Sequence, residues 1–224
     1  DWYPWIATTE STVKLTELTG FSDRPDVEDM ASISENTIRD LLITSADVKK
    51  MTADMCSADT VRAAEMIAES LRGGGKLMFC GNGGSAGDSQ HLAAEFVATL
   101  DHQRPRRGLP ALALTTDTSF LTAYANDFGF EGVFARQVET LGRPGDVLVA
   151  ISTSGNSGNV VKACEAAKTQ DIRIVGMTGQ GGGKIAELAD LLLAVPSTVT
   201  MHIQESHIAL GHAMTLAVER LLDV

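Results

Sequence analysis

Five short apolar segments, separated by stretches long enough for a helix, constrain the fold of this chain more than any other feature. They are residues 76–80, 110–115, 146–151, 172–177 and 191–195. None alternates apolar with polar residues over its length, so both faces of each predicted strand are expected to be buried. Such strands form a parallel sheet covered by helices on both faces. We therefore predict a three-layer α/β/α fold around a five-stranded parallel sheet.

Helical periodicity precedes and follows these segments. Apolar residues recur with helical spacing over residues 33–55 and again over 58–71, which predicts one or two helices before the sheet. A closing helix is expected over about 203–222. Residues 1–34 show no sustained periodicity and are predicted to be a loosely structured extension of a domain spanning 35–224. An alternative is an arm whose Trp2 and Trp5 dock on a neighbouring subunit.

Charge and composition exclude several classes of function. The 224 residues hold 29 acidic side chains against 18 Lys and Arg, a net charge of −11, which disfavours general binding to nucleic acid or anionic membranes. No apolar run approaches the roughly 20 residues that a membrane-spanning helix needs. The three cysteines show no CxxC spacing and the first residues do not resemble a secretory signal, so we expect a reduced, cytoplasmic protein.

A glycine-rich junction follows the first predicted strand. Residues 80–88 read CGNGGSAGD and lead into a predicted helix. Glycines let the backbone approach a ligand, and the free amides of a helix start attract anions. The spacing matches neither GxGxxG nor GxxxxGK[ST], so no nucleotide cofactor is expected. A tight strand-to-helix turn explains this segment alone equally well.

A hydroxyl-rich junction follows the third predicted strand. Residues 151–158 read ISTSGNSG and place Ser152, Thr153, Ser154 and Ser157 beside the amides of another helix start. A neutral cage of donors suits a phosphate monoester that must bind and leave, and the helix dipole adds attraction. One such residue would be only an N-cap. The cluster therefore predicts a phosphate site.

Two predicted helices hold side chains suited to acid/base chemistry. His91 and Glu95 are four residues apart and share a helix face, as a metal pair, an acid/base pair or a surface ion pair would. Gln204 and His212 on the closing helix are roughly 12 Å apart along its axis, so they meet one small ligand only if both lean inward. We expect His207 to face water or to be buried and hydrogen-bonded.

Four motifs in order resemble the phosphoheptose isomerases of the SIS sugar-isomerase superfamily, which has a flavodoxin-like fold. They are GNGGSAGDSQHLAAEF, TTDTSFLTAYANDFGF, DVLVAISTSGNSGNVVKA and IQESHIALGH, and the likeness runs from about residue 34 to residue 224. The resemblance implies an aldose–ketose isomerase that converts sedoheptulose 7-phosphate to D-glycero-D-manno-heptose 7-phosphate through an enediol. It also implies a homotetramer with active sites at subunit interfaces.

The resemblance assigns roles to residues of this chain. Glu95 and His212 occupy the acid/base positions, and some members bind zinc through residues matching His91, Glu95, Gln204 and His212. The implied substrate contacts also include Glu95 and Gln204. The remaining ones are the phosphate-binding Ser152, Thr153, Ser154 and Ser157, with Ser85 nearby, and the sugar-binding Asn82, Gly83, Gly84, Asn126 and Asp127. Asn126 and Asp127 would equally suit a capped turn.

The implied reaction suits these residue types. Moving a carbonyl between neighbouring carbons requires a proton to leave one carbon and return to the other, which a carboxylate such as Glu95 can do. An imidazole such as His212 can move protons between oxygens near neutral pH. A zinc ion would polarise the carbonyl but would weaken a bound Glu95 as a base, so these two roles compete.

One position departs from the family pattern. Thr99 stands where many members have an arginine, and Arg104, Arg106 or Arg107 could compensate. An isomerase of a different phosphosugar is therefore one alternative. Another is a non-catalytic SIS regulatory protein. Such proteins lack the paired acid/base residues, so the presence of both Glu95 and His212 favours an enzyme.

Overall fold

The structure, a computed structural model, describes residues 33–224. The predicted N-terminal extension, residues 1–34, lies outside the described residues except for its last two positions. Residues 42–224 form one compact unit, and residues 33–41 lie outside it. The sheet and the candidate site belong to this unit.

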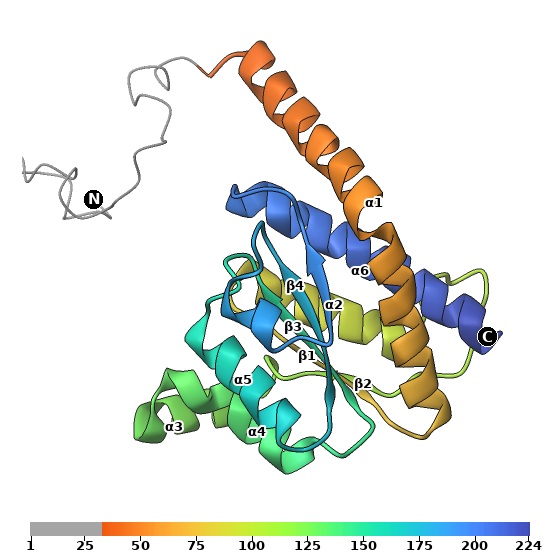
Figure 1. Cartoon of the computed structure of the whole chain (residues 1–224), viewed down its shortest axis with the longest axis vertical. Helices are drawn as coiled ribbons and strands as arrows, with labels where there is room; N and C mark the ends of the chain where they lie inside the picture. The colour runs from red at the N-terminus through yellow and green to blue at the C-terminus, as the bar shows by residue number, and fades with distance from the viewer. Residues whose placement is uncertain (1–32) are drawn as a thin grey trace, which may run out of the picture. The chain divides into compact units, whose positions relative to one another are not determined.

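The five predicted strands all form, and they build one parallel sheet in the order β2-β1-β3-β4-β5 (Figure 1). The strands are β1 (Leu77–Cys80), β2 (Ala111–Ala113), β3 (Val147–Ser152), β4 (Arg173–Thr178) and β5 (Leu191–Ala194). The edge strand β2 is shorter than predicted, since it pairs on one side only and its register with β1 ends at the pair Phe79 and Ala113. The order places β1 beside β3, so the two junctions singled out in the sequence leave neighbouring strands at the same edge of the sheet.

Helices surround the sheet. They are α1 (Glu35–Arg72), α2 (Gly84–Val97), α3 (Thr118–Phe128), α4 (Val133–Leu141), α5 (Gly158–Lys168) and α6 (Thr200–Leu222), with short 3-10 turns at η3 (Phe130–Gly132) and η4 (Gly183–Glu187). The region expected to hold one or two helices is the single helix α1. It continues because the hydroxyls of Ser57 and Thr60 donate to the carbonyls of Ala53 and Cys56, one turn back, instead of capping a new helix. No helix in residues 33–224 combines the length and the apolar character needed to cross a membrane.

Two apolar clusters, one on each face of the sheet, hold the layers together. Phe79 of β1 packs with Phe96 of α2 and Met214 of α6 on one face. Met78, the neighbouring residue of β1, points to the other face, where it packs with Phe134 of α4 and Cys164 of α5. Because successive strand residues point to opposite faces, every strand contributes to both clusters. The predicted three-layer fold is confirmed.

The three cysteines belong to the core of the protein. Cys56, Cys80 and Cys164 are all buried and unpaired with one another. Burial raises the pKa of the Cys164 thiol to about 12 and raises that of Cys80 well above its usual value. Both thiols are therefore protonated and unreactive at neutral pH.

Candidate active site

The glycine-rich junction lets helix α6 approach the start of α2. A Cβ atom at Gly84, the first residue of α2, would lie 2.5 Å from the side-chain nitrogen of Gln204. A larger residue at this position would push the end of that side chain aside. Gln204, which the sequence singles out on the closing helix, therefore lies directly against the glycine-rich junction.

The hydroxyl-rich junction gathers its serines as predicted. The Oγ atoms of Ser152 and Ser157 are 2.9 Å apart, and those of Ser152 and Ser154 are 3.5 Å apart. Thr153 lies between them in the chain, and its backbone carbonyl accepts a hydrogen bond from Gly179. Ser157 is the N-cap residue of α5, yet its side chain makes no capping bond. These hydroxyls are therefore not used up by helix capping, and their phosphate role stays a prediction.

A reciprocal pair of amides joins the two junctions. Asn82 Nδ2 donates to Asn159 Oδ1 over 2.8 Å, and Asn159 Nδ2 donates to Asn82 Oδ1 over the same distance. Asn159 lies in the first turn of α5 and is 4% exposed. The side chain of Asn82, predicted to contact the sugar, thus already has a partner. The sequence holds no local signal for Asn159, because its partner is 77 residues away.

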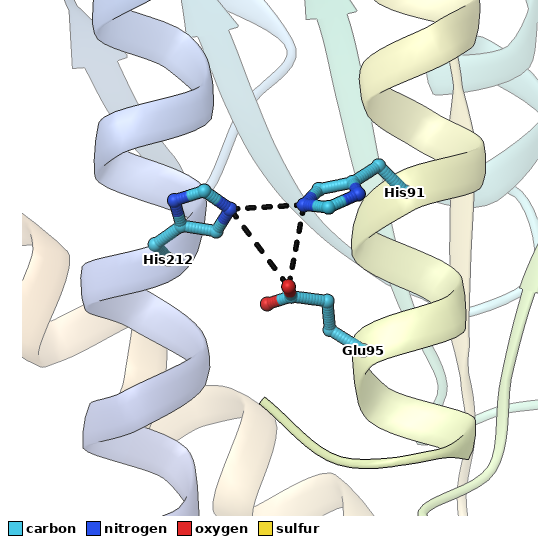
Figure 2. A group of neighbouring side chains, drawn as sticks. All are labelled: His91, Glu95 and His212. Atoms are coloured by element: carbon cyan, nitrogen blue, oxygen red, sulfur yellow. Dashed lines mark hydrogen bonds and ion pairs between the residues drawn. The ribbon is translucent and has the colours of Figure 1, made fainter. Parts of the chain in front are cut away.

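Helices α2 and α6 bring the predicted acid/base residues together. Figure 2 shows His91 and Glu95 of α2 facing His212 of α6. Glu95 Oε1 lies 3.2 Å from His91 Nε2 and 3.9 Å from His212 Nε2. The two Nε2 atoms are 3.0 Å apart, although the residues are 121 positions apart in the chain. The structure therefore selects a convergent cluster over a simple surface ion pair for His91 and Glu95.

Two carboxylates on α2 hold buried oxygens without a hydrogen-bond partner. One is Glu95 Oε2 and the other is Asp88 Oδ2. Burial raises the pKa of Asp88 above its usual value, while a hydrogen bond with Gln204 and the nearby His91 and His212 act in the opposite direction. Asp88 was overlooked as a site residue in the sequence. Its position one helical turn before His91, on the same face of α2, is the signal that would have identified it.

The other polar candidates lie apart from this cluster. His207 is fully buried and its Nε2 donates to the carbonyl of Thr178 over 3.0 Å, so of the two placements expected for it the structure shows the buried, hydrogen-bonded one. Asn126 and Asp127 are exposed on α3, where Asn126 Nδ2 donates a hydrogen bond to Asp127 Oδ1 over 2.8 Å. Within one chain, the structure does not bring these two residues to the α2–α6 cluster.

Arg106 has a different place from the one suggested by the sequence. Its side chain is 2% exposed and its Nε lies 2.6 Å from Glu219 Oε1 on α6. An arginine held in this way has no free face for a substrate, so Arg106 does not compensate for Thr99. Arg104 is exposed beside Asp101 at 4.0 Å, and the hydroxyl of Thr99 donates to the carbonyl of Asp101.

The three clustered side chains fit a divalent metal ion such as zinc. In a tetrahedral zinc site with bonds of 2.0–2.1 Å, neighbouring ligand atoms are about 3.3 Å apart. The donor atoms of His91, Glu95 and His212 are separated by 3.0, 3.2 and 3.9 Å, which brackets that spacing. Two imidazole nitrogens and one carboxylate oxygen are also donors that zinc accepts.

The fold and the site define a class of protein. A parallel sheet with a hydroxyl-rich loop after a central strand is the architecture of a sugar-phosphate binding domain, and the SIS domain model matches residues 45–179. The chain is 53% identical over 188 residues to the phosphoheptose isomerase of Rhodospirillum rubrum, which covers 84% of this chain and 98% of that relative. It is 52% identical to the phosphoheptose isomerase of Akkermansia muciniphila, covering 82% of this chain and 95% of the relative.

Solved structures agree with this assignment. The phosphoheptose isomerase of Neisseria gonorrhoeae superposes with a TM-score of 0.77 at 46% identity, covering 83% of this chain and 98% of the other. That of Francisella tularensis gives a TM-score of 0.80 at 33% identity, covering 84% and 100%. The chain belongs to the phosphoheptose isomerase family of SIS-domain proteins, and it is an isomerase. The non-catalytic regulatory alternative is not supported.

Proposed function

We propose that this isomerase converts sedoheptulose 7-phosphate to D-glycero-D-manno-heptose 7-phosphate, with Glu95 and His212 as the acid/base pair. The observation that supports this most strongly is the convergence of Glu95 and His212 from helices far apart in the chain, with 3.9 Å between the nearest side-chain atoms. Relatives at 52–53% identity are named for the heptose reaction, which favours the seven-carbon substrate.

The hydroxyl-rich junction is the proposed phosphate site. Ser152, Ser154 and Ser157 hydrogen-bond mainly to one another, so their hydroxyls can turn to donate to a bound anion at little cost. The amino end of α5 adds backbone N–H groups and the positive end of the helix dipole. The paired amides of Asn82 and Asn159 hold this loop against the glycine-rich junction, where Gly83, Gly84 and Ser85 would meet the sugar.

Proton transfer is the proposed task of the α2–α6 cluster. Glu95 takes a proton from C1 of the ketose and returns it to C2 of the enediol. His212 takes the hydroxyl proton from O1 and delivers a proton to O2. The products of these steps balance: the C2 carbonyl becomes an alcohol and C1 becomes the aldehyde. Glu95 Oε2 is buried and without a hydrogen-bond partner, so no other group of the described chain competes for a proton that this carboxylate takes up.

Zinc is part of the proposal. His91, Glu95 and His212 would hold it, with Gln204 as the expected fourth ligand. When bound, it would supply a positive charge that polarises the substrate carbonyl. Oε1 is the Glu95 oxygen that faces the imidazoles, so it would be the metal-binding one, and a metal bound there would also lower the basicity of Oε2.

A homotetramer in the cytoplasm, with active sites at subunit interfaces, completes the proposal. In the single chain the side chains of His91 and His212 are 52% and 43% exposed, which leaves the cluster open on one side. Helices α1 and α6 form an apolar groove of about 320 Å³, lined in part by Ala53, Val61 and Leu210. A second copy seated on this surface would bury apolar area and could close the open side of the cluster.

The test is a panel of ketose phosphates of five, six and seven carbons, followed by NMR in D2O with and without added Zn²⁺. We expect turnover of sedoheptulose 7-phosphate with deuterium at C2 of the aldose, and an approximately 10³-fold loss of kcat in Glu95→Gln. Turnover of another ketose phosphate alone would refute the substrate and keep the reaction class. Full activity of Glu95→Gln would refute the acid/base assignment.

A further inference from the structure

A buried ion pair connects the end of α2 with α6. Arg106, in the segment after α2, places its Nε 2.6 Å from Glu219 Oε1, and the two side chains are 2% and 9% exposed. Glu219 Oε1 also accepts a hydrogen bond from the backbone N–H of Leu100 over 3.4 Å. Glu219 follows His212 by seven residues, so both lie on the same face of α6, about two turns apart.

The rest of the guanidinium group caps helix α2. The last carbonyls of a helix have no partner within it, and a positive charge there also opposes the negative end of the helix dipole. Arg106 donates from Nη2 to the carbonyl of Glu95 over 2.8 Å and from Nη1 to the carbonyl of Phe96 over 2.9 Å. The first of these carbonyls belongs to the proposed base itself. Arg106 therefore fixes the backbone from which the Glu95 side chain extends.

The contact surface between α2 and α6, here called the seam, is also tightly packed near its centre. A Cβ atom at Gly211 would lie 2.5 Å from the side chain of Leu92. Gly211 precedes His212, and Leu92 follows His91, so this contact sets the separation of α2 and α6 beside the cluster. The Arg106–Glu219 pair sets it at the end of α2. Together the two contacts leave little freedom in the distance between Glu95 and His212.

We propose that Arg106 and Glu219 form a clamp that positions Glu95 opposite His212, so that Arg106 is a positioning residue for the isomerase reaction. This inference rests on the proposed roles of Glu95 and His212. A buried ion pair often adds little net stability compared with an apolar substitute, because both charges lose their hydration. In this pair, however, the guanidinium group also donates hydrogen bonds to the carbonyls of Glu95 and Phe96 and so fixes the end of α2, which an apolar pair could not do.

The clamp is tested by kinetics per mole of folded enzyme. In Arg106→Gln we expect kcat for the heptose phosphate to fall roughly 10- to 100-fold, because small displacements of reacting groups have effects of that order. KM should stay within about twofold, since the hydroxyl-rich junction on α5 is untouched. Arg106→Lys keeps the charge but not the several N–H donors of the guanidinium group, so it should show a smaller loss of kcat than Arg106→Gln.

The matched control is the ion pair of Lys76 with Asp146 at 2.5 Å, whose side chains are 22% and 2% exposed. Lys76→Gln also removes the cation of a largely buried pair, but from the segment leading into β1. It should lower thermal stability and leave kcat per folded molecule unchanged. Equal losses of kcat in Arg106→Gln and Lys76→Gln would overturn the proposal, because the loss would then not depend on the position of Arg106 at the end of α2.

Exchanging the two charges shows whether Arg106 acts through its hydrogen bonds to the α2 carbonyls or only through its ion pair with Glu219. The double variant Arg106→Glu with Glu219→Arg restores an ion pair but points a carboxylate at the carbonyls of Glu95 and Phe96. We expect no recovery of kcat over Arg106→Gln, whereas recovery to the wild-type value would refute the clamp. If this double variant does not fold, the comparison of Arg106→Lys with Lys76→Gln still decides. An inactive wild-type enzyme would count against the proposed function and not against the clamp.

Discussion

The amino edge of the sheet, where the strands begin, and the central part of the seam between α2 and α6 both contain buried carboxylates, but only those at the amino edge have all their hydrogen-bond partners. Glu219, at the far end of the seam, is paired with Arg106. At the amino edge, Asp146 accepts hydrogen bonds from the Lys76 side chain and from the backbone N–H groups of Lys76 and Arg143. In the seam, Asp88 and Glu95 each keep one buried oxygen without a partner. A fully partnered charge stabilises the fold, whereas an unpartnered one is a cost that a ligand or reaction can offset.

Two buried histidines of α6 also have ring nitrogens without a hydrogen-bond partner. Within residues 33–224, the buried side-chain atoms without a hydrogen-bond partner are Asp88 Oδ2, Glu95 Oε2, His202 Nδ1 and His207 Nδ1. All four lie on α2 or α6. The two helices that form the proposed active site therefore concentrate the unsatisfied polar atoms of the described chain, which is where functional constraint most often opposes stability.

Asp146→Asn gives the largest expected effect on stability. It removes the charge that faces Lys76, whose side chain is 22% exposed, and weakens acceptance from two backbone amides. Breaking a buried pair from one side typically costs 3–5 kcal/mol, and the partial exposure of Lys76 favours the lower end, about 3 kcal/mol. For a chain of this length that is a fall in Tm of roughly 10 °C, measurable by calorimetry. A large fall in kcat per folded molecule would contradict the separation of the two regions.

His207 should make stability depend on pH. Burial lowers its pKa to about 4, while its hydrogen bond to Thr178 acts in the other direction. As the pH falls, His207 therefore gains a proton near pH 6.5 in the unfolded chain but only near pH 4 in the folded chain. Stability is therefore full above pH 6.5 and decreases as the pH falls towards 4, by roughly 2–3 kcal/mol in total.

His207→Gln isolates this contribution. Glutamine keeps an N–H donor for the Thr178 carbonyl but does not titrate. Unfolding by denaturant should show a shallower loss of stability between pH 6.5 and pH 4 in the variant than in the wild type. If both proteins lose stability in parallel over this range, His207 is not the group responsible.

The fold could be predicted from the sequence because its signals are local. Five apolar runs without alternation indicated five buried parallel strands, and all five form. The division of the first helical region could not be settled in this way. Ser57 and Thr60 would suit a helix cap as well as a helix interior. Only the structure shows that their hydroxyls donate to carbonyls one turn back in the same helix, which places them in its interior.

The candidate site was predictable where one helix or one loop holds all the parts. His91 and Glu95 share a helix face, and Ser152 and Ser157 share a loop. His212 joined them through the family resemblance, because nothing local ties it to residues on another helix. Asn159 carries no local signal, and the role suggested for Arg106 was wrong, for the same reason: their partners are brought to them by the packing of distant elements.

Ser157→Ala tests whether the hydroxyl-rich junction works separately from the seam. The substitution removes one donor and leaves Ser152, which is 3% exposed, without its 2.9 Å contact. We expect KM for the phosphosugar to rise about tenfold, equivalent to about 1.4 kcal/mol, because hydrogen bonds to a charged group contribute on that scale. The value of kcat should change little. Inorganic phosphate should compete tenfold less well, and an unchanged inhibition constant would place the phosphate elsewhere.

Asp88→Asn is the smallest expected effect and the sharpest contrast with Asp146. Burial is the main influence on Asp88, and it raises the pKa, so the folded chain binds this proton more tightly than the unfolded chain does. The charged carboxylate therefore lowers stability at neutral pH, and the amide should raise Tm slightly. Protein freed of metal by a chelator is the right sample, because a bound cation would favour the carboxylate. The same change of Asp to Asn would then stabilise the seam and destabilise the amino edge of the sheet. A fall in Tm at both positions would show that Asp88 has a partner in solution, and that unpartnered oxygens do not distinguish the two regions.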